Sequence, residues 1–165
     1  MEPVVNYVKL LEESWEELQN WALKCRFDPK SEGDIQCFLY HCLVEKLGTA
    51  KDIHSEYKYE YERGRRVRID LVIADKVFVE IKYILWRTGR RTEASWKNRK
   101  RDAEKAIGRL RLIRRDSATY RFLAIFAENY EKEDAPWYDD IKKLCDKSGI
   151  KMLKACKRKV EKKVI

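Results

Sequence analysis

The stretch RVRIDLVIADKVFVEIK, from Arg66 to Lys82, decides the fold because apolar and polar residues alternate on both sides of a short turn. Two alternating runs of this kind predict two β-strands that are joined as a hairpin at Ala74-Asp75-Lys76. One face of the expected hairpin is apolar and the other is mostly charged. The apolar face comprises Val67, Ile69, Leu71, Ile73, Val77, Val79 and Ile81, and the opposite face comprises Arg68, Asp70, Phe78, Glu80 and Lys82.

Two carboxylates are expected to face each other in this hairpin. If Ile73 pairs with Val77, Asp70 lies directly across from Glu80, and like charges in that position are destabilising. A divalent cation between the two carboxylates would turn the repulsion into attraction. Mg²⁺ is the expected ion, because it prefers oxygen ligands and is often bound by one or two carboxylates together with water and phosphate oxygens. Lys82 shares the face of Glu80 and could position an attacking water or balance charge on a phosphate.

Apolar periodicity along the rest of the chain predicts one α/β domain, 1–165, around a mixed sheet. Its expected parts are an N-terminal helical extension (1–27), a core (31–127) and a C-terminal helix, strand and basic tail (136–165). The element order is one helix, then αβββαβ, then αβ. Helices are expected at about 4–24, 31–47, 95–115 and 136–149, and strands at about 54–61, 66–73, 77–82, 120–128 and 150–156.

An Asp on one strand and Glu-x-Lys on the next, within an αβββαβ order, resembles the PD-(D/E)xK nuclease superfamily, which includes restriction endonucleases and archaeal Holliday-junction resolvases. The pattern here is Ile69-Asp70, nine intervening residues, then Glu80-Ile81-Lys82, with Ile69 in place of the Pro. The resemblance covers Ser31 to about Ala127. It implies a restriction-endonuclease-like core and hydrolysis of DNA phosphodiester bonds by a water that Mg²⁺ activates, with Mn²⁺ able to substitute. It also implies that Asp70, Glu80 and Lys82 are catalytic and that Asp70, Glu80 and Ile81 contact the metal.

The superfamily commonly adds an acidic residue from the helix before the first strand. Glu32, in the first turn of the expected helix, is the best match and completes the candidate catalytic set. Asp34 and Glu45 are the alternatives. A purely structural interpretation of Glu32 is also open, because a carboxylate is favoured at a helix N-terminus.

A basic segment follows the Glu-x-Lys strand and favours a nucleic-acid substrate. Residues 84–115 hold twelve Lys or Arg residues and three acidic residues. Their excess of nine positive charges equals the net charge of +9 of the whole chain. Phosphates drawn to this segment would lie near the candidate metal site. The residues expected to bind nucleic acid are Arg87, Arg90, Arg91, Lys97, Lys100, Arg101 and Lys105.

Composition limits the other classes of function. A strongly basic chain favours an anionic partner, although a heat-adapted surface rich in Lys and Glu is an alternative source of the charge. No apolar run approaches the roughly 18 residues of a membrane-spanning helix, and the acidic N-terminus does not resemble a signal peptide. Five cysteines without a CxxC pair indicate reduced thiols in a cytoplasmic protein.

Two further hypotheses concern partners. The chain could be a non-catalytic nucleic-acid-binding module that retains a nuclease-like fold. The resemblance also allows a homodimer, because nucleases that cut both strands often pair two sites, and the N-terminal helix could form the interface.

Overall fold

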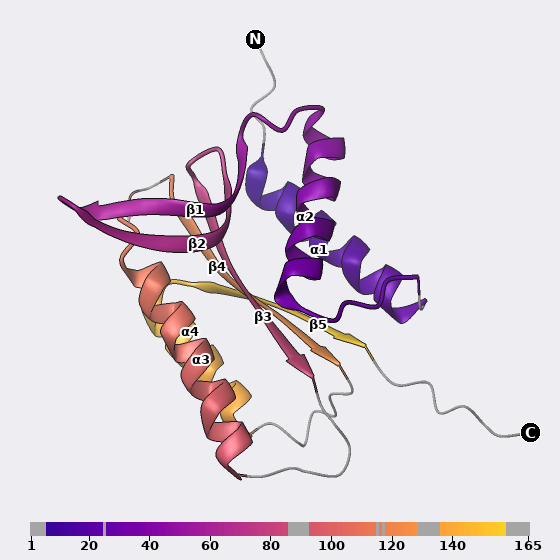
Figure 1. Ribbon diagram of the computed structural model, residues 1–165, viewed down its shortest axis with the longest axis vertical. Helices are drawn as coiled ribbons and strands as arrows, with labels where there is room; N and C mark the ends of the chain where they lie inside the picture. Colours follow the sequence, from indigo (N-terminus) through magenta and orange to yellow (C-terminus); the bar gives the residue numbers. More distant parts are fainter. Residues whose placement is uncertain are drawn as a thin grey trace, which may run out of the picture.

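The computed structural model describes residues 6–24, 26–85, 93–114, 116, 118–128 and 136–157. All nine expected elements are found there in the expected order, and the basic tail after Lys157 lies outside the described residues. The third helix ends at Arg111 rather than near Arg115. The elements are α1 (Tyr7–Leu23), α2 (Glu32–Leu47), β1 (Ile53–Glu62), β2 (Arg65–Ile73), β3 (Val77–Leu85), α3 (Glu93–Arg111), β4 (Tyr120–Glu128), α4 (Pro136–Ser148) and β5 (Lys151–Lys157) (Figure 1).

The five strands form one mixed sheet in the order β1-β2-β3-β4-β5. The first three strands are an antiparallel meander, and β4 and β5 continue the sheet parallel to β3. Helices α1 and α2 lie on one face of the sheet, and α3 and α4 lie on the other (Figure 1). The chain is therefore an α/β protein with a mixed central sheet, as the periodicity predicted.

Local sequence signals explain the ends of α2. The Ser31 side chain accepts a hydrogen bond from the main-chain N–H of Asp34 at 3.2 Å, which satisfies one of the free N–H groups at the start of the helix. Gly48 ends the helix in a left-handed conformation, with φ of 68°, and its N–H donates to the Val44 carbonyl. Glycine adopts this conformation at little steric cost. These two caps fix the first turn of α2, which contains Glu32.

The apolar stripe of α1 packs on the same side of the sheet as α2. Leu11, Trp15, Leu18 and Ala22 are buried there, as their spacing predicted. They share a core with apolar residues of α2 and of the central strands. The N-terminal helix is thus part of the main core on this face.

Arg121 on β4 joins the two helices on the opposite face. Arg121 is 7 % exposed, and its guanidinium donates to the carbonyl of Leu110 at 3.4 Å and to that of Ser148 at 2.7 Å. These carbonyls lie at the C-terminal ends of α3 and α4, where a positive charge is favourable. The arginine therefore stabilises both helix ends beneath the sheet.

The outer part of β2 does not keep the face that the alternation predicted. Leu71 packs with α1 and α2, whereas Ile69, two residues earlier, packs in the core with α3 and α4, and Val67 follows it. The prediction that Val67 and Ile69 share a face with Leu71 is therefore wrong. The change of face occurs at Asp70.

In the neighbouring strand β1, the side on which the inward side chains pack also changes, next to the change in β2. Ile53 packs on the α1 and α2 side, while Tyr57 packs against the core of α3 and α4. Glu56 lies between them with φ of 53°, a left-handed conformation. Strict alternation of faces requires continuous extended dihedrals, so one such residue rotates the strand beyond it.

No helix in the described part of the chain is long and apolar enough to cross a membrane. Cys37, Cys42 and Cys145 are free thiols.

Candidate active site

The candidate site lies where β2 and β3 separate. These two strands pair at Ile73 with Val77 and continue to Leu71 with Val79, where the recorded register ends. The next main-chain donor of β3 on that side, the N–H of Ile81, donates to the Asp70 carboxylate at 2.7 Å. A side chain thus replaces the main chain of the neighbouring strand. Asp70 is held in the gap between the two strands.

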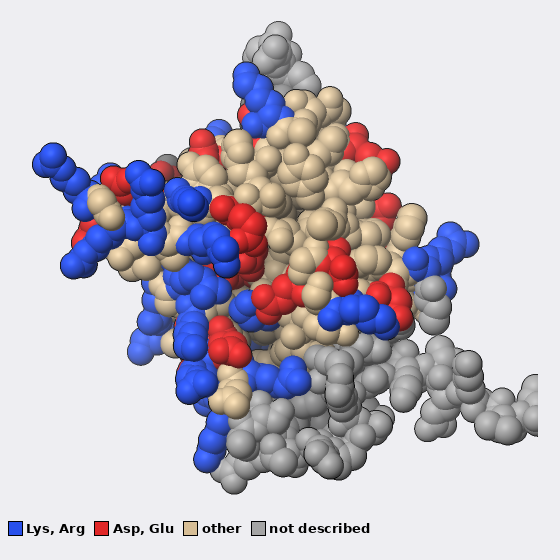
Figure 2. Space-filling model, in the orientation of Figure 1, with Lys and Arg blue, Asp and Glu red and all other residues tan. Residues whose placement is uncertain are grey.

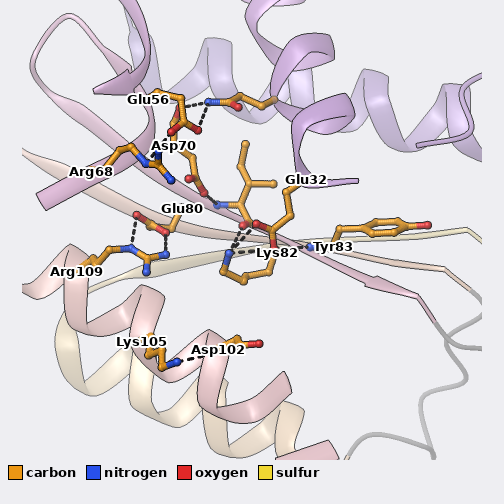
Figure 3. Close-up of polar contacts among 12 residues, drawn as sticks. Glu32, Glu56, Arg68, Asp70, Glu80, Lys82, Tyr83, Asp102, Lys105 and Arg109 are labelled. Atoms are coloured by element: carbon orange, nitrogen blue, oxygen red, sulfur yellow. Dashed lines mark hydrogen bonds and ion pairs between the residues drawn. The ribbon is translucent and has the colours of Figure 1, made fainter. Parts of the chain in front are cut away.

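Residues of α2 and β1 hold the main chain of β2 at this position. The side-chain amide of Gln36 on α2 donates to the Asp70 carbonyl and, at 3.5 Å, to the Glu56 carboxylate. The second oxygen of Glu56 pairs with Arg68 at 2.8 Å. This chain of contacts links α2, β1 and β2 around Asp70 (Figure 3).

Glu80 has no exposed surface, and its charge is matched by an arginine that the sequence analysis did not single out. Arg109 of α3 donates from Nε to one oxygen of Glu80 at 2.9 Å and from Nη2 to the other oxygen (Figure 3). A fork-shaped pair of this kind is among the strongest charge-assisted contacts. Arg109 lies three residues after the buried Ala106 and four before the buried Ile113, so it borders the apolar stripe of α3. This position beside the apolar stripe is the feature of the sequence that could have indicated a partly buried arginine.

Burial raises the pKa of Glu80 from 4.5 to about 7. The hydrogen bonds from Arg109 oppose this increase, and the charge of Asp70 adds to it. Burial also raises the pKa of Asp70, while the hydrogen bond from Ile81 and the charge of Lys82 oppose the increase. Desolvation is the largest cause of the raised pKa in both groups, and a neighbouring carboxylate adds to it in each case, Asp70 for Glu80 and Glu32 for Asp70.

Lys82 turns toward α2 and meets Glu32. Its Nζ lies 2.9 Å from each oxygen of Glu32 and also donates to the Ile81 carbonyl at 2.8 Å. The Lys82 side chain is 14 % exposed, against 46 % for Glu32. Glu32 additionally accepts from the main-chain N–H of Tyr83 at 3.4 Å. The ammonium of Lys82 is therefore fixed beside the gap that holds Asp70.

Of the three acidic candidates on α2, only Glu32 reaches this place. Asp34 instead accepts a hydrogen bond from the main-chain N–H of Lys30 at 2.7 Å, in the helix cap. Glu45 lies near the other end of the helix and pairs with His41 at 3.4 Å on the surface. The four residues Glu32, Asp70, Glu80 and Lys82 thus come together from α2, β2 and β3.

The predicted nucleic-acid contacts are partly described. Arg87, Arg90 and Arg91 lie outside the described residues. Lys97, Lys100, Arg101 and Lys105 lie on α3, in the helix that also carries Arg109. Lys100 is paired with Asp140 of α4 at 2.7 Å, and Lys105 is 3.7 Å from Asp102. Figure 2 shows blue side chains gathered along α3 and the β1–β2 hairpin, beside a central group of carboxylates.

No protein-family model matches the chain, and no curated protein matches it. The interpretation of this site therefore depends on its own geometry.

The donor atoms at the site suit a hard divalent cation. Asp70 and Glu80 offer carboxylate oxygens and Ile81 offers a main-chain carbonyl, and Mg²⁺ is commonly bound by one or two carboxylates with waters. The Arg109 guanidinium is a positive group already seated against Glu80. Within the described part of the chain, no three His, Cys, Asp or Glu side chains form a metal-binding group. The candidate ligands are the carboxylates of Asp70 and Glu80 and the main-chain carbonyl of Ile81.

Proposed function

We propose that this protein is a Mg²⁺-dependent nuclease that hydrolyses phosphodiester bonds in DNA, with Mn²⁺ able to replace Mg²⁺. The observation that carries the proposal is the convergence of the buried carboxylate of Glu80 and the half-buried carboxylate of Asp70 with Lys82, where β2 and β3 separate. Burial raises the pKa of both carboxyl groups, so their charge is costly without a cation. Such an arrangement favours a functional site over a structural one.

The fit to a metal involves a change at Arg109. Asp70 and Glu80 would hold the ion, and the Ile81 carbonyl, which now accepts from Lys82, would be the third contact. When bound there, Mg²⁺ supplies Lewis-acid polarisation of the phosphodiester and a water with a lowered pKa. Both oxygens of Glu80 accept from Arg109, so a metal at this carboxylate would compete with Arg109 for at least one of them. A guanidinium released in this way could contact a phosphate of the substrate.

Lys82 and Glu32 have separate roles. Lys82 positions the attacking water and balances the charge that develops on the phosphate. Glu32 acts through Lys82, because its two oxygens hold the ammonium at 2.9 Å. We assign Glu32 as a positioning residue in the predicted catalytic set.

The proposal includes a fold type and a mode of substrate binding. The αβββαβ core from α2 to β4 is a restriction-endonuclease-like arrangement to which α1 is added. The cations of α3 contact phosphates beside the site, because this helix also supplies Arg109.

One observation favours a second function, a non-catalytic nucleic-acid-binding module. Glu80 is fully engaged by Arg109, and Lys82 is fully engaged by Glu32. With these two ion pairs only Asp70, among the four described residues of the site, lacks a cationic partner of its own, so a metal is less needed to balance the charge of the site. The basic surface would then bind nucleic acid without cleaving it.

The cleavage rate of the Lys82→Ala variant distinguishes a nuclease from a non-catalytic binding module. We expect this variant to lose about a hundredfold or more of the wild-type cleavage rate on linear duplex DNA in Mg²⁺, while DNA binding remains. Lys76→Ala, in the turn of the same hairpin, is the matched control and cleaves as the wild type does. Equal cleavage by wild type and Lys82→Ala would show that the nuclease assignment is wrong. Binding by the wild type without turnover in Mg²⁺ or Mn²⁺ would support the module.

A further inference from the structure

The outer half of the β1–β2 hairpin is a two-stranded ribbon that extends beyond the rest of the sheet. Residues 57–69, which we call the ribbon, pair with each other from Tyr57 with Ile69 out to Glu62 with Arg65. The recorded pairing of β2 with β3 begins only at Leu71. Figure 1 shows the ends of β1 and β2 projecting away from the helices and the other strands.

One side of the ribbon is anchored to the body of the protein. Tyr57, Tyr59 and Val67 pack against the core under α3 and α4. The Tyr59 ring meets Phe78 edge-on, with 5.6 Å between centroids, and its hydroxyl accepts from the main-chain N–H of Arg114 at 3.2 Å. The ribbon is therefore held in a fixed direction, with its opposite side and its tip exposed.

The exposed side and tip are basic. The ribbon carries five cations against two carboxylates, Glu60 and Glu62. The side chains of Arg65, Arg66 and Arg68 are 70 %, 62 % and 71 % exposed, although each arginine is paired with a nearby glutamate. Exposed pairs contribute at most about 1 kcal/mol, so a phosphate or a base edge can replace the glutamate. The five cations are Lys58, Arg63, Arg65, Arg66 and Arg68.

The ribbon is also connected to the candidate active site. Ile69, its last residue, directly precedes Asp70. Arg68 pairs with Glu56, which accepts from Gln36, and Gln36 also holds the Asp70 carbonyl. A ligand on the basic side of the ribbon would therefore lie next to the gap between β2 and β3.

We propose that the ribbon enters the major groove of duplex DNA and holds the duplex beside Asp70 and Glu80. The major groove of B-form DNA accepts a two-stranded β-ribbon, whereas that of A-form RNA is too deep and narrow. Single strands are bound mainly by stacking on exposed aromatic rings, and two of the three tyrosines of the ribbon are packed against the core. Arginine side chains on such a ribbon can contact guanine edges and phosphates. The placement of the duplex beside the two carboxylates rests on the proposed nuclease function, but groove binding does not.

The test measures binding of the full chain in EDTA, where no cleavage occurs. The probes are a labelled duplex of about 20 base pairs and one of its single strands, at several salt concentrations. Arg63→Ala/Arg66→Ala removes two exposed cations of the ribbon, and Lys143→Ala/Lys147→Ala removes two exposed cations of α4 as the matched control. We expect the ribbon variant to bind the duplex about tenfold or more weakly, with the slope of log K against log salt reduced by about two. The control keeps the wild-type affinity for the duplex to within a few-fold.

Two further measurements show which groove is occupied and whether the loss of binding is due to the lost charges. Methylation of guanine N7 by dimethyl sulfate should be blocked by the wild type and restored with the ribbon variant, because N7 lies in the major groove. Arg63→Lys/Arg66→Lys should recover most of the salt slope, since it keeps both charges, and melting temperatures show whether each variant is folded.

The outcomes distinguish this inference from the proposed function. Equal duplex binding and equal N7 protection by wild type and the ribbon variant would overturn the inference, even if Lys82→Ala had lost cleavage. Tighter binding of the single strand than of the duplex by the wild type would also overturn it. If Lys82→Ala cleaves normally and the ribbon variant still loses duplex binding, groove binding stands and the nuclease assignment fails.

Discussion

Arg109 of α3 donates through both Nε and Nη2 to the carboxylate of Glu80, a side chain with no exposed surface. The pair joins the centre of the sheet to the helix that covers it, and it offsets part of the repulsion between Asp70 and Glu80 that the sequence predicted. Its consequences can be measured in the stability of the metal-free protein.

Arg109→Gln should destabilise the metal-free protein at pH 8 by about 3 kcal/mol, because it leaves a buried carboxylate without its counter-charge. We expect a value at the low end of the usual range, since the Arg109 side chain is 34 % exposed and water can partly replace it. Urea denaturation measures the change. Arg101→Gln, an exposed residue of the same helix, should stay within about 0.5 kcal/mol of the wild type. An equal effect of the two substitutions would show that the Glu80 pair is unimportant for stability.

The same variant tests the competition between Arg109 and a metal. Without the guanidinium, Glu80 is available to a divalent ion, so Mg²⁺ should raise the melting temperature of Arg109→Gln by more than it raises that of the wild type. Thermal unfolding with and without Mg²⁺ gives both increments. Equal nonzero increments would mean that Arg109 does not compete for the site. The absence of any increment in both proteins would contradict metal binding itself.

The high pKa of Glu80 predicts how stability depends on pH. The folded state keeps the proton of Glu80 up to about pH 7, whereas the unfolded chain releases it near pH 4.5. Between these values the folded state binds more protons, so the free energy of unfolding falls as the pH rises. The contribution is fully present below pH 4.5 and is lost as the pH rises through 7, and it amounts to about 3 kcal/mol.

Glu80→Gln should therefore flatten the dependence of stability on pH between 5 and 8. Asp70 also has a raised pKa, so any slope that it contributes has the same sign. Urea denaturation at several pH values gives the slopes, and Glu45→Gln on the exposed face of α2 should keep the wild-type slope. A wild-type protein whose stability increases over this range would contradict the assignment.

Asp70→Asn should raise the melting temperature of the metal-free protein and remove most of its response to Mg²⁺. The amide oxygen can still accept from the Ile81 N–H, while the charge that faces Glu80 is gone. For the wild type, a hundredfold excess of Mg²⁺ over its dissociation constant gives about 2.7 kcal/mol, or roughly 5–10 °C.

The control for this experiment is Asp146→Asn on α4, which should keep the full response to Mg²⁺. If Asp70→Asn instead lowers the metal-free melting temperature and the wild type ignores divalent ions, the two carboxylates are structural and the nuclease proposal fails.

Arg121→Met should lower the melting temperature by about 5–10 °C, which corresponds to about 2–3 kcal/mol. The substitution keeps the buried aliphatic stem but removes the donors to the carbonyls of Leu110 and Ser148. Differential scanning calorimetry measures the shift. Arg26→Met at an exposed position should change the melting temperature by no more than about 1–2 °C. A wild-type melting temperature for Arg121→Met would show that the two helix ends do not need this residue.

The sequence by itself determined the elements, their order and one half of the site. Periodicity and caps such as Ser31 and Gly48 are local signals, because the residues involved are neighbours in the chain. The register of the central hairpin is local too, since a short turn leaves few ways to pair Ile73 with Val77. That register placed Asp70 and Glu80 on facing strands.

Only the tertiary structure decided which groups complete the site. Arg109 comes from a helix 29 residues beyond Glu80, and Glu32 comes from a helix 50 residues before Lys82. Neither distance along the chain predicts a contact, because helix position is set by how the apolar stripes pack on the sheet. The left-handed conformation of Glu56 could not be predicted either, because the alternation of apolar and polar residues assumes a continuously extended strand. Glu56 lies on β1 at the level where both strands change face, so the side on which Ile69 packs was known only from the structure.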